Sequence, residues 1–356
     1  MQENPSLDRL FMERALQLAR CGTGSTSPNP MVGAVIVADG RIIGEGYHIR
    51  AGEPHAEVNA VNSVSDADRP LLQRSTIYVS LEPCSHFGKT PPCCDLIISC
   101  HIPRVVIATT DFNAQVNGGG IARMRAAGID VVVGLLGDEA RGLNRAFFTY
   151  HTCKRPTVTL KWAQSADGFI DSLRQDGKPV RFSNGVSQMA VHKLRAMHDA
   201  ILVGTRTALL DDPSLDIRHW AGRAPLRLVI DKEGKLPAGL KLFDGSLPTV
   251  CLTDKGIVLG DGKKVEQVAL DFSKDIIPQI LEFLHSRGVG SLLVEGGAAL
   301  LNSFVDSGAW DVARVETNRD ISLGEGVAAP CLGAVREVER EILAGNEIVL
   351  LEKSEI

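Results

Sequence analysis

The sequence contains no long apolar run. Its most apolar stretches, such as residues 131–133 and 291–294, are far too short to cross a lipid bilayer. Residues 1–5 contain neither the basic nor the apolar segment of a signal peptide, so we expect a cytoplasmic protein. The chain also lacks an excess of positive charge, since 38 Lys and Arg stand against 43 Asp and Glu. We therefore expect neither a nucleic acid nor a membrane as partner, although this does not exclude a local basic pocket.

Disulfide scaffolds, internal repeats and low-complexity tracts are also absent. Secreted disulfide scaffolds pack many cysteines into short chains, whereas this chain has eight in 356 residues. Four of the cysteines cluster at positions 84, 93, 94 and 100, which fits metal binding better than disulfide bonding. The other four are expected to be ordinary buried thiols. A chain of this length suggests two domains.

The pattern of apolar residues predicts an α/β domain in the first part of the chain. Residues 6–20 have helical spacing and stop before Gly22, while Asp39-Gly40 is typical of a turn between two strands. Strands are predicted at residues 32–37, 41–44, 76–81, 104–108 and 129–133. One helix is predicted to begin at Pro54 and another to span residues 121–127, and the segment that begins at Pro83 is predicted to be a helix or a loop. This alternation favours a layered fold whose later strands are parallel.

A second α/β domain is predicted after a polar stretch at residues 137–155, which Pro156 ends. The predicted domains are residues 1–150 and 151–356. In the second, strands are predicted at residues 157–161, 200–203, 226–230, 249–252 and 291–295, and helices at 186–197, 276–286 and 298–304.

His55-Ala-Glu57, Pro83-Cys84 and Cys93 together predict a zinc centre. One imidazole and two thiolates can hold Zn²⁺ and leave a fourth position for water, and Glu57 can carry protons. This combination is typical of base deaminases, although eight residues separate the cysteines here instead of two. Two alternatives remain open: Cys94 could replace Cys93, and a fourth cysteine ligand would make the site purely structural.

The first half resembles the deaminase half of the bifunctional riboflavin-biosynthesis deaminase–reductases. The resemblance is carried by Ser27-Pro-Asn29-Pro-Met-Val-Gly33, Gly46-Tyr-His48, the His55 motif, and Pro83-Cys84-Ser-His86-Phe-Gly-Lys89-Thr90-Pro-Pro-Cys93. In that family the eight-residue insertion is regular, which favours Cys93 as the ligand. The resemblance implies a cytidine-deaminase-like α/β/α fold and zinc-hydroxide deamination of a diaminohydroxyphosphoribosylaminopyrimidine. Its implied substrate-binding residues are Asn29, His48, His86, Lys89 and Thr90, with Lys89 where the family usually has Arg.

The second half resembles the reductase half of the same family. Weak signals occur in the family's order: Leu160-Lys161, Ser165-Ala-Asp167-Gly168, Asp211-Asp-Pro-Ser-Leu215 and Val294-Glu295-Gly-Gly297. The resemblance implies a dihydrofolate-reductase-like α/β fold and NADPH-dependent reduction of the ribosyl group to a ribityl chain. The residues implied to face the substrate are Lys161, Arg195, Leu215, Arg218 and Glu295. Those implied to face NADPH are Thr207, Asp211, Gly297, Ala298, Ala299, Leu300 and Leu301.

Two stretches of the second half depart from the family pattern. Gly177-Lys-Pro179-Val-Arg181 stands where Gly-x-Ser-x-Trp is usual, and the stretch 316–329 lacks the usual Pro-Lys-x-x-Gly turn. Arg181 replaces a Trp expected against the cofactor, and an arginine there can stack on a ring or pair with the 2′-phosphate.

Two other functions are alternatives to the bifunctional enzyme. One is a monofunctional zinc base or nucleoside deaminase with a non-catalytic second domain, and another is a zinc-structured binding protein without turnover. The long insertion and the acidic composition disfavour a tRNA deaminase, and the retained Glu57 disfavours a protein without turnover. The expected partner is a small phosphoribosyl-pyrimidine, and we expect a homo-oligomer, either a dimer or a tetramer.

Overall fold

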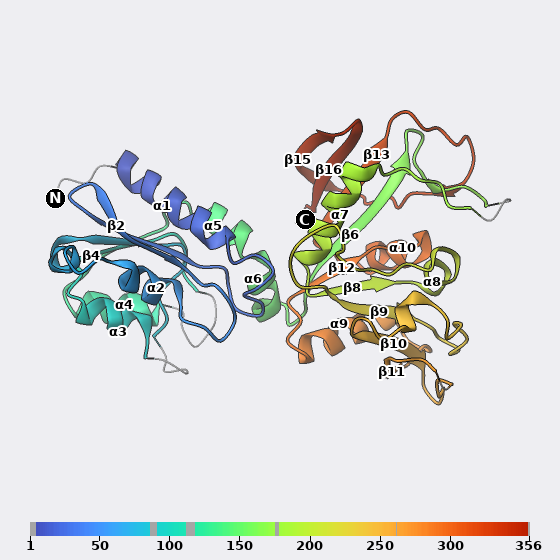
Figure 1. Ribbon diagram of the computed structural model, residues 1–356, viewed down its shortest axis with the longest axis horizontal. Coiled ribbons are helices and arrows are strands. Elements are labelled where there is room, and N and C mark those ends of the chain that lie inside the picture. Colours follow the sequence, from blue (N-terminus) through green and yellow to red (C-terminus); the bar gives the residue numbers. More distant parts are fainter. Residues whose placement is uncertain (1–4, 86–90, 112–117, 175–177, 261, 355–356) are drawn as a thin grey trace. The chain divides into compact units, whose positions relative to one another are not determined.

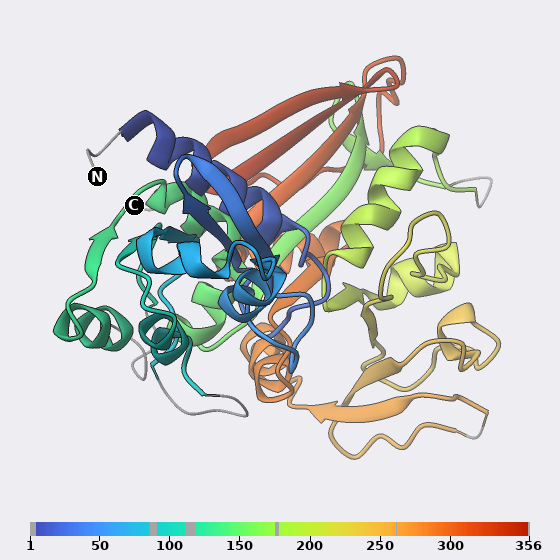
Figure 2. The ribbon, with the colours of Figure 1, turned by 60° about the vertical axis from the view of Figure 1, so that its left-hand side comes forward.

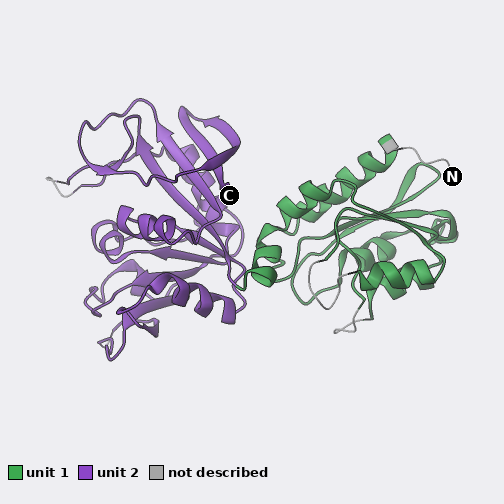
Figure 3. Cartoon of the chain, turned by 180° about the vertical axis from the view of Figure 1, so that it is seen from behind, with its two compact units in different colours: residues 1–154 green, residues 155–356 purple. Residues whose placement is uncertain are grey.

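The computed structural model describes residues 5–354 except 86–90, 112–117, 175–177 and 261. The chain divides into two compact units, residues 1–154 and 155–356 (Figure 3). The predicted boundary after residue 150 falls inside helix α6 (Arg145–Thr152), because residues 137–152 of the polar stretch form two helices. No helix among the described residues combines the length and the apolar character needed to cross a membrane.

The first unit is a three-layer α/β/α sandwich, as the sequence indicated. Within its described residues, five strands lie in the order β2-β1-β3-β4-β5. They are β1 (Gly33–Ala38), β2 (Arg41–Tyr47), β3 (Thr76–Val79), β4 (Arg104–Ile107) and β5 (Asp130–Val133), of which the last three run parallel. The helices are α1 (Pro5–Arg20), α2 (Ala56–Ser63), α3 (Cys93–Ser99), α4 (Gly119–Ala126), α5 (Gly137–Leu143), α6 and the short 3-10 helix η1 (Arg69–Arg74).

The two faces of this sheet bury alternate side chains of the same strands. Val35 and Val37 of β1 pack with the apolar face of α1 and with α5, while Ala34 and Ile36 pack against α2, α3 and α4. Figure 1 shows α1 and α5 on one side of the sheet and α2, α3 and α4 on the opposite side. Because β1 is buried on both faces, its sequence is a continuous apolar run and does not alternate between apolar and polar residues.

The second unit contains a larger mixed sheet. Within its described residues the order is β11-β10-β9-β8-β12-β6-β13-β16-β15, with β7 and β14 forming a separate pair. The strands are β6 (Thr157–Ser165), β7 (Phe169–Asp171), β8 (Ala200–Val203), β9 (Leu226–Ile230), β10 (Thr249–Asp254), β11 (Glu266–Leu270), β12 (Ser291–Val294), β13 (Val312–Asn318), β14 (Val327–Ala328), β15 (Val335–Leu343) and β16 (Asn346–Lys353). The helices are α7 (Gly185–Ala196), α8 (Thr205–Asp211), α9 (Ile276–Ser286), α10 (Ala298–Asp306) and the 3-10 helix η2 (Lys241–Phe243).

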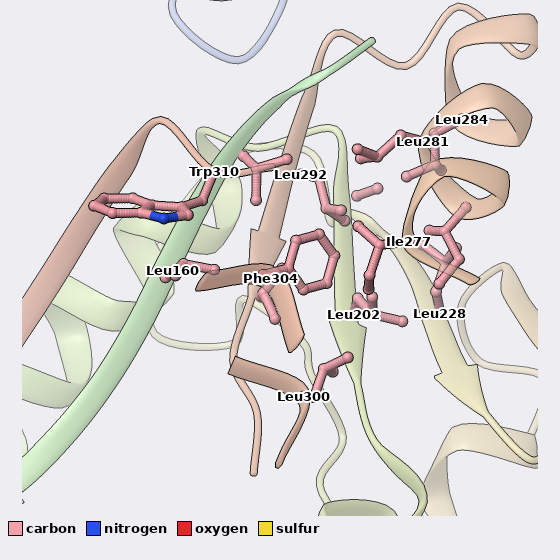
Figure 4. Close-up of a cluster of buried hydrophobic side chains, with 14 of the residues drawn as sticks. Leu160, Leu202, Leu228, Ile277, Leu281, Leu284, Leu292, Leu300, Phe304 and Trp310 are labelled. Carbon is pink, nitrogen blue, oxygen red and sulfur yellow. The ribbon is translucent and has the colours of Figure 1, made fainter. Parts of the chain in front are cut away.

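The main core of this unit lies between the sheet and helices α9 and α10. Figure 4 shows Leu160, Leu202 and Leu292 of three neighbouring strands packed against side chains such as Phe304 and Leu281. These strands are central and parallel, so the apolar residues of their other face form a second cluster with α7 and α8. The carboxyl ends of β6, β8, β9 and β12 therefore lie along one edge of the sheet.

Three long strands of this sheet were not predicted. β13 pairs with β6 and carries the β16–β15 hairpin, which Figure 2 shows continuing the sheet in orange and red. The side chains of β15 are mostly exposed and alternate between acidic, basic and apolar types without a buried face. The sequence of β15 therefore lacks the alternation of apolar and polar residues from which a strand is predicted.

Candidate active sites

Three elements bring His55, Cys84 and Cys93 together. His55 precedes α2 as its N-cap residue, Cys84 follows β3 and Cys93 begins α3. The helix predicted from Pro54 thus begins two residues later, and the segment after Pro83 is not helical as far as Ser85. The Nδ1 atom of His55 lies 3.7 Å from the Cys84 Sγ atom and 3.4 Å from the Cys93 Sγ atom.

The spacing and chemistry of these three donors fit a zinc ion. Their ligand atoms all lie within 4.8 Å of one another. A tetrahedral Zn²⁺ with Zn–S bonds of about 2.3 Å and Zn–N bonds of about 2.1 Å holds its nitrogen and sulfur ligands about 3.6 Å apart. The donor set supplies three ligands, and a fourth position then remains for water or substrate, which is the arrangement of catalytic zinc sites.

Cys94 points away from this cluster. Its side chain is fully buried among the apolar residues beneath α3, and its Sγ atom lies 3.7 Å from the Asp95 Oδ1 atom. Burial, with the nearby Asp95 carboxylate, raises the pKa of the Cys94 thiol to about 11. The structure thus groups Cys93, and not Cys94, with the other two donors.

Replacing Cys93 should therefore lower the zinc content of the protein, whereas replacing Cys94 should not. Cys93→Ser is expected to weaken zinc binding by more than the roughly 10- to 100-fold typical of changes around a ligand, since it removes a thiolate donor. Cys94→Ser is expected to retain zinc at the level of the unaltered protein. Metal analysis of both purified variants measures this, and loss of zinc from Cys94→Ser alone would show that the ligand is Cys94.

The two ligand cysteines share their protons unequally. The Cys93 thiol donates a hydrogen bond to the Cys84 sulfur. The His55 ring also stabilises the Cys84 thiolate, as does the Cys93 backbone N–H, whose nitrogen lies 3.3 Å from the Cys84 Sγ atom. Together they lower the pKa of Cys84 to about 4, although burial opposes them. The pKa of Cys93 is raised by the same contact and by burial. Cys84 is thus ready to bind a cation as a thiolate.

Glu57 lies in the first turn of α2 with only 3% of its surface exposed. Burial raises the pKa of its carboxyl group to about 7, against the opposing influence of His55. The carboxyl group is within hydrogen-bonding reach of the Cys93 thiol, so it faces the metal cluster. A carboxyl group with a pKa near neutrality can both accept and return a proton.

His48 and Asn29 form the wall beside the metal cluster. The ring of His48 stands edge-on to that of His55, with the centroids 5.4 Å apart. Its Nδ1 atom lies 3.1 Å from the Pro54 carbonyl oxygen, and the Asn29 amide nitrogen lies 3.2 Å from Nε2. Burial lowers the pKa of His48, so the ring is neutral and can accept from Asn29. The predicted residues His86, Lys89 and Thr90 lie outside the described residues.

Glu82 supports this site and was missed in the sequence. Its carboxylate is 4% exposed and accepts from the backbone N–H groups of Gly118 and Gly120 (both N···O 3.1 Å), with Asp111 and Ile121 at 3.4 Å. These bonds attach the start of α4 to the residue two before Cys84. A glutamate beside a proline has no distinctive sequence signal, because its partners are backbone groups 29 to 39 residues away in the chain.

The second unit has a cavity of about 1040 Å³ at the carboxyl edge of its parallel strands. Most of the residues predicted for the reductase site line it. They are Lys161, Arg181, Thr207, Asp211, Arg218, Glu295, Gly297, Ala298, Ala299, Leu300 and Leu301. Gly297 has φ +70° and α10 begins directly after it without a side-chain cap, which leaves backbone N–H groups free to bind a phosphate. The cavity therefore fits a dinucleotide.

Arg195 and Leu215 do not line the cavity. Arg195 lies behind Glu295 and binds it through two bonds, Nε to Oε1 at 2.9 Å and Nη2 to Oε2 at 2.7 Å. Leu215 has φ +51° and its side chain is 2% exposed in the core formed with α8. The left-handed backbone turns this side chain away from the cavity, and a substrate contact of Leu215 stays a prediction.

Buried charges surround the inner end of the cavity. Burial raises the pKa of Glu295, but the Arg195 guanidinium and Lys161 outweigh it and bring the pKa to about 2. Burial lowers the pKa of Lys161, opposed by Glu295. Glu295 is thus a carboxylate at neutral pH, held between two cations in a site from which water is largely excluded.

A salt-bridged arginine, also missed in the sequence, fastens the segment between β7 and α7. Arg174 binds Asp171 at the end of β7 and reaches the Asp211 Oδ1 atom of α8 at 2.7 Å. Asp211, predicted to face the cofactor, thus shares its carboxylate with this guanidinium. At the other end of the segment, the Phe182 carbonyl oxygen accepts from Asn318 and Asn346, both at 2.9 Å. Arg181 therefore stands on the β13–β16 side of the cavity.

Comparison with known proteins adds independent findings. The RibD C-terminal domain family matches residues 156–318, and the cytidine and deoxycytidylate deaminase zinc-binding region matches residues 5–109. The riboflavin biosynthesis protein RibD of Aquifex aeolicus is 40% identical over 339 residues, covering 94% of this chain and 93% of that protein. RibD of Escherichia coli is 42% identical over 243 residues, 64% of each chain.

A solved structure matches over almost the whole chain. It is the diaminohydroxyphosphoribosylaminopyrimidine deaminase/5-amino-6-(5-phosphoribosylamino)uracil reductase of Thermotoga maritima. The TM-score is 0.90 at 35% identity, and the match covers 99% of this chain and 100% of that one. A structure of Acinetobacter baumannii RibD matches with a TM-score of 0.86 at 29% identity.

Proposed function

The chain belongs to the RibD family of riboflavin-biosynthesis proteins, and on that premise we propose which of its residues carry out the family's two reactions. It is a bifunctional enzyme, with a zinc-binding deaminase unit and an NADPH-dependent reductase unit. The predicted fold and function are confirmed, and the reading of the second domain as non-catalytic is not favoured, since a reductase family matches it.

The position of Glu57 beside the cluster of His55, Cys84 and Cys93 carries the proposal for the deaminase. These three residues would hold a zinc ion, which would lower the pKa of a bound water molecule. Glu57 would pass one proton of that water to the ring nitrogen, and the second, taken from the hydroxyl group formed on the ring, to the amine, which leaves as ammonia. His48 and Asn29, which are joined by a hydrogen bond, orient the pyrimidine.

We propose that the pyrimidine is the diaminohydroxyphosphoribosylaminopyrimidine named for the Thermotoga maritima relative. Hydrolysis replaces its ring amine by a carbonyl oxygen and releases ammonia. Lys89 and Thr90 are proposed to bind this substrate together with His86, on the strength of the motif alone.

The reductase site is proposed at the inner end of the cavity. NADPH supplies the hydride, and the protein orients it toward C1 of the ribosyl group. Lys161 and Glu295 face the substrate, Arg195 holds the Glu295 carboxylate in place, and Arg218 meets the substrate phosphate. The cofactor is proposed to contact Thr207 and the start of α10, with Arg181 beside its nicotinamide end.

One assay tests both activities in the full chain. The purified protein is given the aminopyrimidine substrate with and without NADPH, and ammonia release and NADPH oxidation are followed. We expect ammonia in both cases and oxidation of NADPH only when the substrate is present. Ammonia without NADPH oxidation would contradict the reductase assignment, and zinc-loaded protein that releases no ammonia would contradict the deaminase assignment.

We further propose a cytoplasmic homo-oligomer, a dimer or a tetramer. Among the described residues β15 is the last strand in the order of its sheet, and its outer edge can pair with a second copy. Val338 and Ile342 on this strand are 46% and 63% exposed. Light scattering of the purified protein measures the mass, and a monomer would contradict the proposal.

A further inference from the structure

The order of the strands gives the cavity of the second unit a direction. β9, β8, β12 and β6 are consecutive parallel neighbours, and residues at their carboxyl ends line the cavity. Lys161 on β6 and Glu295 after β12 mark the end where the substrate is proposed to lie. A dinucleotide that reaches them with its nicotinamide must place its adenosine half on the other side of Gly297, over β8 and β9.

The side of the cavity next to β9 suits an adenosine. Ile230, the last residue of β9, lines it together with Ile276 and Ile277 at the start of α9. β9 is two strands from β12, which at the usual spacing is roughly 10 Å. The Thr205 hydroxyl donates to the Ile230 carbonyl oxygen at 2.6 Å, so the first turn of α8 is fastened to this end of β9.

Arg206 follows Thr205 and is the cation on this side. Among the described residues, the basic side chains lining the cavity are Lys161, Arg174, Arg181, Arg206 and Arg218. Arg174 is bound to Asp171 and Asp211, and Arg218 to Asp216 at 2.7 Å.

Lys161 and Arg181 stand on the other side of β12, toward β6 and β13. Arg206 is exposed, and no hydrogen bond or ion pair is recorded for it within the part of the chain that the structure describes. Its guanidinium is therefore available to a ligand over β8 and β9.

The acid that follows β9 is turned away from the cavity. In Rossmann folds an acidic residue of this kind accepts the ribose 2′-hydroxyl of NAD, and a like charge in that place would repel a 2′-phosphate. Here the Asp231 carboxylate, 2% exposed, accepts from the Lys235 and Leu236 backbone N–H groups at 2.9 and 3.0 Å. The buried Lys263 ammonium lies 3.2 Å from its Oδ2 atom and neutralises it. Asp231 can thus neither bind the hydroxyl nor repel a phosphate.

We propose that Arg206 binds the 2′-phosphate of NADPH and makes the reductase select NADPH over NADH. The proposal rests on the reductase site proposed above, since that site sets the direction of the cofactor. A planar guanidinium can bind a phosphate through two parallel hydrogen bonds, and such charge-assisted bonds are among the strongest in proteins.

Calorimetry on the full-length enzyme tests this without turnover. Adenosine 2′,5′-bisphosphate and adenosine 5′-monophosphate differ only by the 2′-phosphate. Arg206→Ala is expected to weaken binding of the bisphosphate by roughly 10- to 100-fold and to leave binding of the monophosphate unchanged. In the reductase assay, the preference for NADPH over NADH, as a ratio of kcat/KM, should fall by a similar factor.

Lys241→Ala is the matched control. It removes the same charge from an exposed residue that is paired with Asp212 and does not line the cavity, and it should change neither affinity. Equal weakening of both nucleotides by Arg206→Ala, or no weakening of either, would overturn the role of Arg206 alone. An unaltered enzyme that binds neither the bisphosphate nor NADPH would instead overturn the proposed reductase site.

Discussion

Glu57→Gln is expected to keep its zinc and to slow deamination by roughly 10²- to 10⁴-fold, the usual contribution of a general acid–base group. The amide keeps the shape of the side chain but can neither accept the proton of water nor pass a proton to the leaving ammonia. Ammonia release and the zinc-to-protein ratio, measured on the same preparation, separate the loss of proton transfer from the loss of metal.

The variant should also fold. Because burial raises the pKa of Glu57 to about 7, the folded protein disfavours the charged carboxylate, and a neutral amide removes that disadvantage. The activity lost in Glu57→Gln is therefore not expected to come from unfolding. Reductase activity of the same variant, measured with the deaminated pyrimidine as substrate, should be unchanged.

Glu53→Gln is the control for a change of charge near the site. Glu53 is an exposed carboxylate two residues before His55, and its exchange should leave both zinc content and deamination unchanged. Deamination that persists in Glu57→Gln would show that another group moves the proton. Zinc lost from Glu57→Gln would instead give the carboxylate a part in holding the metal.

The zinc site was predictable because its chemistry is concentrated in short motifs. His55 and Glu57 are two residues apart, and the sequence alone named both with Cys84. Spacing could not choose between Cys93 and Cys94, because consecutive residues of a helix point in directions about 100° apart. That choice depends on which face of α3 packs on the sheet, which is a property of the folded unit.

The second unit was harder to predict for a related reason. Its cavity collects residues from β6, α8, β12 and α10, and each of their motifs is common by itself. The pattern around Asp211 placed Leu215 near the substrate, but no pattern indicates that a left-handed backbone turns this side chain into the core. The pairing of Arg174 with Asp211 likewise has no sequence signal, since it joins a loop to the end of a helix.

Arg195→Met is expected to destabilise the second unit by about 3–5 kcal/mol, because it leaves the buried Glu295 carboxylate without its main partner. The chain's three tryptophans, at positions 162, 220 and 310, all lie in this unit, so denaturant unfolding followed by tryptophan fluorescence reports on it. Arg287→Met is the control, because the side chains of Arg287 and its partner Glu266 are 38% and 47% exposed. Loss of this exposed ion pair should lower the free energy of unfolding by less than about 1 kcal/mol.

The deficit of Arg195→Met should depend on pH in one direction. The pKa of Glu295 lies near 2 in the folded unit and has an ordinary value of 4.5. A lowered pKa means that the ion pair stabilises the folded unit fully above pH 4.5 and loses this effect as the pH falls toward 2. The difference in unfolding free energy between the unaltered protein and Arg195→Met should therefore be largest near neutrality and shrink as the pH falls, because burial raises the pKa of Glu295 once Arg195 is removed. A difference that stays the same at low pH would show that lost packing, and not lost charge, causes it.

Removing both charges separates stability from catalysis. Arg195→Met combined with Glu295→Leu fills the site with apolar side chains, and such replacements of buried ion pairs are often neutral or stabilising. We expect the double variant to recover part of the lost stability, because the buried Lys161 loses the Glu295 carboxylate. It should have no measurable reductase activity, while deamination continues. A double variant that still oxidises NADPH with the deaminated pyrimidine would remove Glu295 from the proposed site. If it recovers stability without activity, the buried pair is there for the substrate, because apolar side chains in its place would also hold the unit together.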